Sequence, residues 1–328
     1  MKVLVVGGTG QLGANLVRAL LVHGDQVRVM IRSTSHTQSL EGLDLERVTG
    51  DLNDPPSLRR ACEDVQVVYQ AASYYPTATI PAAEAKAHAL RETTHLLDAV
   101  RAASVERLVF TSTLTTIGLS PRPGGLATEE YPFSTAFSNN PYLIAKSAME
   151  RAVLDAARQG IPAVVVNPTA FFGPYDQKPT SGTQILMIAK RRMPGYIQGL
   201  VNVIDVRDVA AAMIRAAERG RVGERYIVGN WNTTQQAVNR LIARCAGVMA
   251  PLIPIPFPFA HLGSKLGEWA WRRIRPTPPP VPAFFVEVLK HMQHYDCSKA
   301  LRELDYPRHS VEQAIRDALE WFRERRYL

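Results

Sequence analysis

The chain has few cysteines and no long apolar run. These two absences argue against disulfides, a cysteine-bound metal and a membrane-spanning helix. Its 328 residues include three widely spaced cysteines, Cys62, Cys245 and Cys297, which show no metal-ligand pattern. We therefore expect free thiols, no metal and a cytoplasmic protein. No apolar stretch is long enough to cross a bilayer. An apolar strand starting at residue 2 leaves no room for a signal peptide, so we expect none.

An excess of acidic residues is also missing. The formal net charge is +8, from 38 lysines and arginines against 30 acidic residues. A basic protein attracts anions, and nucleic acid is one candidate. Because the chain contains no recognised nucleic-acid-binding motif, a phosphorylated cofactor and an anionic small-molecule substrate are the simpler explanations.

The first segment has the pattern of a nucleotide-binding turn. Residues 2–6 are an apolar run typical of a strand buried on both faces, and glycines follow at spacing three, at Gly7, Gly10 and Gly13. Apolar residues then recur at helical spacing until Gly24. Glycines here let the backbone approach a pyrophosphate bound at the helix N-terminus. The alternative is an ordinary glycine-rich turn, but the flanking strand and helix favour a dinucleotide site.

The end of the second strand, residues 26–31, bears on the choice of cofactor. NAD-selective sites usually carry Asp or Glu near this position, whereas this chain has Arg32. A guanidinium suits a 2′-phosphate, so we favour NADP(H) over NAD(H). The alternative is an exposed arginine in a loop. Further along, Asp51 follows a third strand and could meet the adenine amino group, unless it belongs to a plain strand-end turn.

Tyr142 and Lys146 form the pattern that carries chemistry. Hydride transfer to a carbonyl leaves an alkoxide that needs a proton, which a Tyr phenol can supply. Residues four apart share one helix face, so Lys146 is expected to lower the pKa of Tyr142 and to hold the cofactor ribose. A third group should bond the substrate oxygen, and the apolar strand 107–110 ends in a cluster of hydroxyls, Thr111, Ser112 and Thr113. The alternative is a helix with a half-buried Tyr and a solvated Lys.

The order of these motifs resembles a known family. The chain is similar to extended short-chain dehydrogenases/reductases of the NAD-dependent epimerase/dehydratase group, especially dihydroflavonol-reductase-like and hopanoid-associated sugar-epimerase-like members. The resemblance rests on the motifs above and on these further segments: Gly50-Asp51-Leu52, Gln70-Ala71-Ala72, Phe110-Thr111-Ser112-Thr113, Asn167-Pro168-Thr169, Asp205-Val206-Arg207-Asp208-Val209 and residues 297–304.

The resemblance implies an α/β fold, site residues and a homodimer. The fold would be a Rossmann-like doubly wound parallel sheet with a smaller, discontinuous C-terminal substrate-binding domain. The implied catalytic residues are Thr113, Tyr142 and Lys146. The implied cofactor contacts are Gly7, Thr9, Gly10, Gln11, Leu12, Gly13, Arg32, Asp51, Leu52, Ala71, Ala72, Lys146, Asn167 and Thr169. One departure is Ala89, where many members carry an Asn of the proton relay.

The strand and helix pattern divides the chain into two discontinuous regions. Residues 1–170 alternate as in a doubly wound sheet, and 200–222 are expected to return to this dinucleotide-binding domain. Residues 171–199 and 223–328 would mainly form the substrate-binding region. Within it, 224–229 is predicted to be a strand of a small partner sheet.

Residues 251–285 differ in composition from the rest of the chain. Prolines flank a segment that contains Trp269, Trp271, Arg272 and Arg273. We favour a helical lid packed over the substrate cleft. The alternative is peripheral contact with a membrane surface, because aromatic rings and basic side chains favour that interface. Either structure suggests an apolar or bulky substrate.

Two enzymatic functions and one non-enzymatic function fit these features. The leading hypothesis is NADP(H)-dependent reduction of a ketone or aldehyde, with Tyr142 as proton donor. The alternative is a nucleotide-sugar epimerase or dehydratase that retains its cofactor, in which Arg191 and Arg192 could bind the diphosphate. A non-catalytic nucleotide sensor is the third, and the presence of both Tyr142 and Lys146 argues against it.

Overall fold

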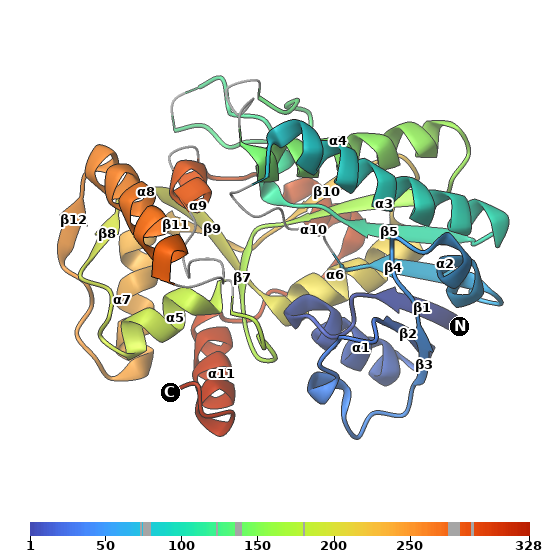
Figure 1. Ribbon diagram of the computed structural model, residues 1–328, viewed down its shortest axis with the longest axis horizontal. Coiled ribbons are helices and arrows are strands. Elements are labelled where there is room, and N and C mark those ends of the chain that lie inside the picture. The colour runs from blue at the N-terminus through green and yellow to red at the C-terminus, as the bar shows by residue number, and fades with distance from the viewer. Residues whose placement is uncertain are drawn as a thin grey trace.

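The main body is built on one large parallel sheet. A computed structural model describes residues 1–72, 74, 80–122, 124–134, 140–179, 181–274, 283–289 and 292–328. Seven strands lie in the order β10-β6-β5-β4-β1-β2-β3, and every adjacent pair is parallel (Figure 1). Their bounds are β1 (Lys2–Val6), β2 (Gln26–Ile31), β3 (Glu46–Thr49), β4 (Val67–Gln70), β5 (Arg107–Thr111), β6 (Ala163–Pro168) and β10 (Arg225–Val228). The predicted doubly wound α/β fold is confirmed.

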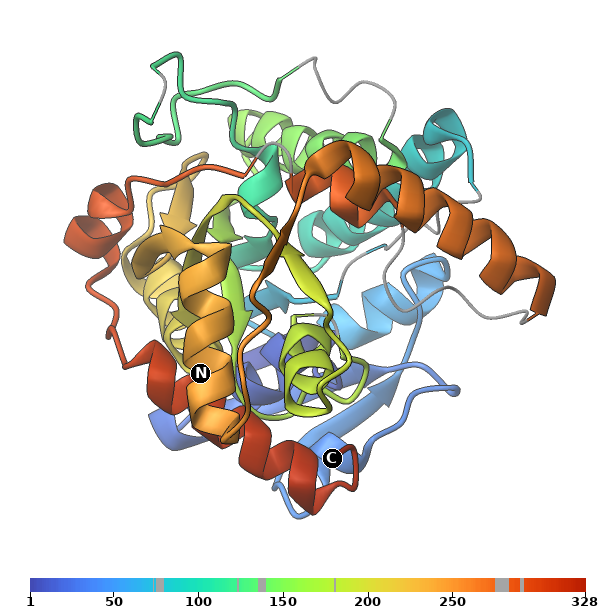
Figure 2. The same ribbon diagram turned by 90° about the vertical axis from the view of Figure 1, so that its left-hand side faces the viewer.

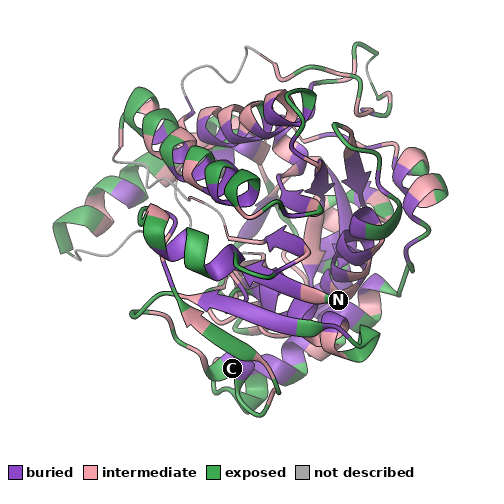
Figure 3. Cartoon of the chain, turned by 90° about the vertical axis from the view of Figure 1, so that its right-hand side faces the viewer, coloured by how far each residue is buried: buried purple, intermediate pink, exposed green. Residues whose placement is uncertain are grey.

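The central strands are rich in apolar residues because helices cover both faces of the sheet, whereas β3 at its edge is largely exposed (Figure 3). Val3 and Val5 of β1 lie in a core shared with α1 (Gln11–His23) and α6 (Val206–Arg219). Leu4 and Val6 point the other way, into a core shared with the helices of the opposite layer. These helices are α2 (Pro55–Cys62), α3 (Ala82–Ala102) and α4 (Pro141–Arg158).

One strand prediction is wrong. We expected residues 224–229 in a small partner sheet, but β10 extends the main sheet, with Tyr226 opposite Val166 of β6. The physical reason is the return of α6 to the main body: it packs against α1, and the chain leaving it runs parallel to β6. Tyr226 and Val228 accordingly share the core of α6. An apolar strand pattern alone does not specify which sheet the strand joins.

The remaining elements form a smaller C-terminal region (Figure 2). A three-stranded sheet orders as β11-β9-β7, and β8 pairs with β12. The strands of this C-terminal region are β7 (Ala170–Phe172), β8 (Gly195–Ile197), β9 (Leu200–Asp205), β11 (Trp231–Thr234) and β12 (Ile253–Ile255). Its helices are α5 (Gly182–Ala189), α7 (Gln235–Ala246), α8 (Phe257–Ile274), α9 (Ala283–Leu289) and α11 (Val311–Glu324), whereas α10 (Ser298–Leu304) packs on α6 and β10. In the described part of the chain, no helix has the length and apolarity needed to span a bilayer.

The turn between β1 and α1 brings backbone segments unusually close. A Cβ on Gly13 would lie 2.1 Å from the Gly7 carbonyl oxygen, and a Cβ on Gly7 would lie 2.4 Å from the amide nitrogen of Ala72. Gly7 also has a φ of +91°, which favours glycine. By contrast, the nearest atom to a Cβ on Gly10 would be the Gly7 oxygen at 3.6 Å. Gly7 and Gly13 therefore allow the backbone of the turn to pack closely, whereas Gly10 has open space above it.

This difference predicts unequal effects of two matched substitutions. Gly13→Ala should lower the free energy of unfolding by about 2 kcal/mol or more, because backbone must move to admit the methyl group. Gly10→Ala should change it by less than about 1 kcal/mol. Urea denaturation of both variants followed by circular dichroism measures the difference. Equal stabilities would contradict the close packing of Gly13 against Gly7.

Candidate active site

The predicted site residues gather at the carboxyl edge of the main sheet. Val6 of β1 lies opposite Gln70 of β4, and Gln70 lies opposite Phe110 of β5. These three strands therefore end side by side, next to the point where the strand order reverses between β1 and β4. Ligands of open α/β sheets bind at such a point. The glycine turn, residues 71–72 and Thr113 each follow one of these strand ends.

The start of α1 fits the pyrophosphate of a dinucleotide. Gly10 is its N-cap, and no described side chain caps the helix, so the first N–H groups and the positive dipole end face the space above Gly10. Nearby, Gln11 donates from Nε2 to the Gly173 carbonyl oxygen at 2.8 Å. Gln11 Oε1 and Thr169 Oγ1 are buried without a hydrogen-bond partner. Buried orphan groups of this kind are expected where a ligand supplies the partner.

Other predicted cofactor contacts follow the ends of β2, β3 and β4. Asp51 Oδ1 accepts hydrogen bonds from the backbone and side-chain nitrogens of Asn53 at 2.8 and 3.2 Å. The amides of Ala71 and Ala72 both donate to the Val6 carbonyl oxygen at 2.9 Å, so they shape the site through the backbone. Arg32 is exposed in a turn after β2. The structure thus gives Arg32 access to an incoming phosphate.

The three predicted catalytic residues lie together. The Tyr142 hydroxyl hydrogen-bonds with the side chains of Thr113 and Thr115. The Lys146 ammonium lies 5.9 Å from the centre of the Tyr142 ring. Thr115 also donates to Thr113 Oγ1, at 3.3 Å. A phenol and two hydroxyls therefore converge on one point, where a carbonyl oxygen could be bound and protonated.

Burial dominates the electrostatics of this group. Loss of hydration raises the pKa of Tyr142, and its hydrogen bonds to Thr113 and Thr115 oppose that rise. The lowering by Lys146 that the sequence suggested is not among the causes. Burial lowers the pKa of Lys146 itself to about 8. In this state the phenol keeps its proton, as a proton donor must.

Asn140 sets the position of Tyr142. It is the N-cap of α4, and its Oδ1 accepts from the backbone nitrogens of Tyr142 and Leu143 at 3.1 and 3.2 Å. Its Nδ2 donates to Glu287 of α9 at 3.3 Å. The same buried side chain therefore starts the catalytic helix and ties it to α9.

A buried polar network holds the Thr113 loop. Asn167 Nδ2 donates to the Thr113 carbonyl oxygen at 3.1 Å and to Glu150 Oε2 at 2.6 Å. Arg225 of β10 donates to Glu150 Oε1 at 2.7 Å, and Thr116 donates to Glu150 Oε2 at 2.5 Å. Asn167, which we expected to contact the cofactor, thus positions the loop through its nitrogen, while its Oδ1 has no partner.

Sequence reasoning missed Thr115, Asn140, Glu150 and Arg225. Glu150 lies four residues after Lys146 on the helix face shared with Tyr142, so spacing offered a signal. Asn140 directly before a proline is a helix-start signature. Arg225 had no signal, because only the placement of β10 brings it to Glu150.

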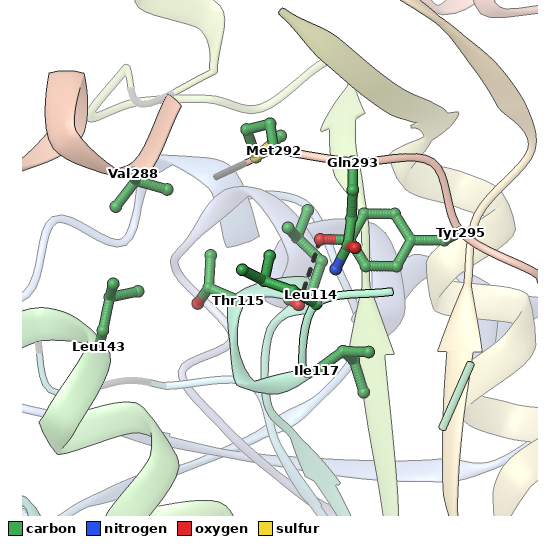
Figure 4. A pocket seen from close by; sticks show the side chains of 9 residues that line it. Leu114, Thr115, Ile117, Leu143, Val288, Met292, Gln293 and Tyr295 are labelled. Atoms are coloured by element: carbon green, nitrogen blue, oxygen red, sulfur yellow. Dashed lines mark hydrogen bonds between the residues drawn. The ribbon is translucent and has the colours of Figure 1, made fainter. Parts of the chain in front are cut away.

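A small apolar pocket adjoins Tyr142 (Figure 4). The Tyr142 ring packs against the cluster of Leu143 and Val288, and both line the pocket. The lining residues are Leu114, Thr115, Ile117, Leu119, Leu143, Val288, Met292, Gln293 and Tyr295, none of them charged. Gln293 is already bonded, donating to the Gly118 carbonyl oxygen and accepting from the Ser120 amide. The hydroxyls in this lining are those of Thr115, which donates to Thr113, and Tyr295, which donates to the Leu114 carbonyl oxygen at 3.5 Å.

The described residues contain no group of three or more His, Cys, Asp or Glu side chains able to hold a metal ion.

The depressed pKa of Lys146 predicts an effect on stability. A lysine whose folded pKa is about 8 costs stability when charged, fully below pH 8 and decreasingly as the pH rises toward its ordinary value of 10.5. Lys146→Met should therefore stabilise the cofactor-free protein at pH 7, by roughly 1–3 kcal/mol.

Urea denaturation at pH 7 and pH 10 measures this gain, which should shrink at the higher pH. Lys190→Met, at an exposed position after α5, is the matched control and should change little. A gain that is the same at both pH values would show that charge is not its cause.

Comparison with known sequences places this site in context. The family model described as "NAD dependent epimerase/dehydratase family" matches residues 3–229. A Synechocystis sp. protein that carries the name of a dihydroflavonol 4-reductase is 35% identical, over 99% of this chain and 95% of its own length. Sterol demethylase protein B of Methylococcus capsulatus is 34% identical, over 99% of both chains.

A solved structure is similar along the whole chain. The crystal structure of PA4631, described as a nucleoside-diphosphate-sugar epimerase from Pseudomonas aeruginosa, has a TM-score of 0.84 and 27% identity, and the match covers 100% of this chain and 99% of that one. The expected resemblance is confirmed. The glycine turn and the seven-stranded sheet agree with the family match. This chain therefore belongs to the NAD-dependent epimerase/dehydratase family of extended short-chain dehydrogenases/reductases and is an NAD(P)-dependent enzyme.

Proposed function

We propose that this protein uses NADP(H) to reduce a ketone or aldehyde that carries an apolar group. One observation carries the proposal: the Tyr142 hydroxyl, bonded to Thr113 and Thr115, lies beside a pocket whose lining has no charged side chain. Such a pocket favours an apolar substituent, since burying uncharged surface is favourable and burying an unpaired charge is costly.

The residues have separate roles in this reaction. The bound, reduced cofactor supplies a hydride to the carbonyl carbon. Thr113 and Thr115 donate hydrogen bonds to the carbonyl oxygen, and Tyr142 delivers the proton that converts the alkoxide to an alcohol. Lys146 would hold the ribose hydroxyls and favour the phenolate that remains. The raised pKa of Tyr142 keeps the donor protonated before the substrate arrives.

Arg32 supports NADP(H) as the cofactor. Its side chain is exposed after β2, where a ribose 2′-phosphate is bound in folds of this kind, and its backbone is held by Ser35 at 3.2 Å and 2.9 Å. A guanidinium there matches the charge and geometry of a phosphate. A carboxylate would instead favour the ribose hydroxyl of NAD(H).

A nucleotide-sugar epimerase or dehydratase is the second candidate. The likeness to PA4631 and the net charge of +8 support it. There the same residues would remove a proton from a sugar hydroxyl, and the hydride would later return to the sugar. A diphosphate needs cationic partners, and Arg191 and Arg192 are exposed after α5. Neither lines the pocket beside Tyr142, which favours the reductase.

Tyr142→Phe should abolish turnover while leaving cofactor binding intact. Removing a general acid typically slows a reaction by about 10²–10⁴-fold, whereas the ring still packs against Leu143 and Val288. NADPH absorbance with a panel of apolar ketones and aldehydes measures turnover, and quenching of protein fluorescence measures cofactor binding.

The same assay decides between the two candidates. Net consumption of NADPH by the wild-type protein supports the reductase. Interconversion of nucleotide sugars without net consumption would replace it by the epimerase. Full activity of Tyr142→Phe in either reaction would contradict the assignment of Tyr142 as the proton-transfer group.

Arg32→Ser should lower kcat/KM for NADPH by about 10–100-fold and leave the value for NADH nearly unchanged, because only the former offers the 2′-phosphate. Arg151→Ser is a matched control, since Arg151 is 85% exposed on α4. A wild-type preference for NADH would contradict the cofactor assignment and leave the catalytic assignment in place.

A further inference from the structure

Helix α8 presents apolar side chains to solvent. Phe259, Leu262, Leu266 and Trp269 follow one another at intervals of three and four residues, so they form one stripe along the helix. Their exposed fractions are 70%, 57%, 58% and 56%. Single exposed apolar residues are ordinary, but a continuous row of four is typical of a surface that binds something.

The opposite face of α8 is turned inward and carries a buried carboxylate among half-buried residues that include Phe257, Ala260 and Trp271. Glu268 is buried, accepts a hydrogen bond from the Ala283 amide of α9 at 3.0 Å, and pairs with Arg272 one turn away. Soluble helices normally bury their apolar stripe and expose such carboxylates. The expected helical lid over residues 251–285 includes 275–282, which lie outside the described residues. Within α8 the exposed stripe lies on the side away from the buried Glu268.

Cations border the stripe. Lys265, Arg272 and Arg273 are exposed, and the Arg273 guanidinium lies 4.0 Å from the centre of the Trp269 ring. In that arrangement the ring and the charged head occupy the same level along the helix. Apolar side chains flanked by basic ones suit the boundary between acyl chains and anionic headgroups.

The position of α8 leaves this face accessible. Its C-terminal part projects from the body, as Figures 2 and 3 show from opposite sides. Its inner face packs on α9, and Val288 of α9 lines the pocket beside Tyr142. A surface that binds α8 would therefore lie close to the pocket.

We propose that α8 docks in the interface of an anionic lipid membrane. The apolar stripe enters the headgroup–acyl boundary, and Lys265 and Arg273 contact anionic headgroups. The helix lies in the plane of the surface, and no described helix could span the bilayer. Delivery of a membrane-borne carbonyl substrate to the pocket beside α9 rests on the proposed function, but docking itself does not.

A second copy of the chain fits this surface less well. A two-fold contact through the stripe would bring Lys265 and Arg273 of both copies to the same interface, where like charges repel. A stable protein interface also covers about 800 Å² on each partner, which a single row of four side chains on a projecting helix does not supply.

The test is co-sedimentation of the purified full chain with vesicles, without substrate or cofactor. Vesicles of phosphatidylcholine are compared with vesicles containing phosphatidylglycerol. We expect at least about tenfold tighter binding to the anionic vesicles, weakened by salt. Leu262→Asp/Leu266→Asp should reduce binding by about tenfold or more. Val22→Asp, at a position 90% exposed on α1, is the matched control and should bind as the wild type does.

Several outcomes would overturn the proposal. These are no binding to either vesicle, binding that ignores the Leu262/Leu266 change, and a dimer in sedimentation equilibrium that this change dissociates. Circular dichroism and cofactor binding check that the variant is folded, because its substitutions lie on the exposed stripe. Since no turnover is measured, failure of the reductase assignment leaves this result unaffected.

Discussion

The carboxylate of Glu150 is the group on which the catalytic edge of the sheet depends. It is buried on α4 and receives hydrogen bonds from three other parts of the chain, through Thr116, Asn167 and Arg225. Burying a carboxylate is costly unless a cation and hydrogen bonds replace its hydration, and here all of its partners are in place. The network fixes α4 relative to β5, β6 and β10. It thereby sets the distance between the Thr113 loop and Tyr142.

This rigid framework surrounds reactive groups whose own hydration is poor. Lys146 lies one turn before Glu150, is 6% exposed and has a pKa lowered to about 8 by burial. The protein therefore holds a partly desolvated cation where ribose hydroxyls would bind, at a cost to the stability of the cofactor-free state. Preorganised polar groups in a water-poor site act strongly on developing charge. Under the proposed function, the cofactor ribose would offer hydrogen bonds to Lys146, for which the described residues show none.

The C-terminal region reaches the pocket beside Tyr142 through α9. α9 reaches the catalytic helix through Glu287 and Asn140 and adds Val288 to the pocket. α8 packs on α9 with the face that carries Glu268. Under the proposed function, a change in α9 would alter the substrate pocket while the sheet edge stays the same.

The sequence by itself determined the parallel sheet, the glycine turn and the Tyr142–Lys146 pair, because each depends on local periodicity: an apolar run covered on both faces, a tight turn before a helix, and residues four apart. It did not determine that β10 extends the main sheet, that Arg225 meets Glu150, or that burial outweighs Lys146 in setting the pKa of Tyr142. Nor did it determine which face of α8 is exposed. These depend on which distant segments pack together, since strand partners and the loss of hydration arise only once tertiary contacts form.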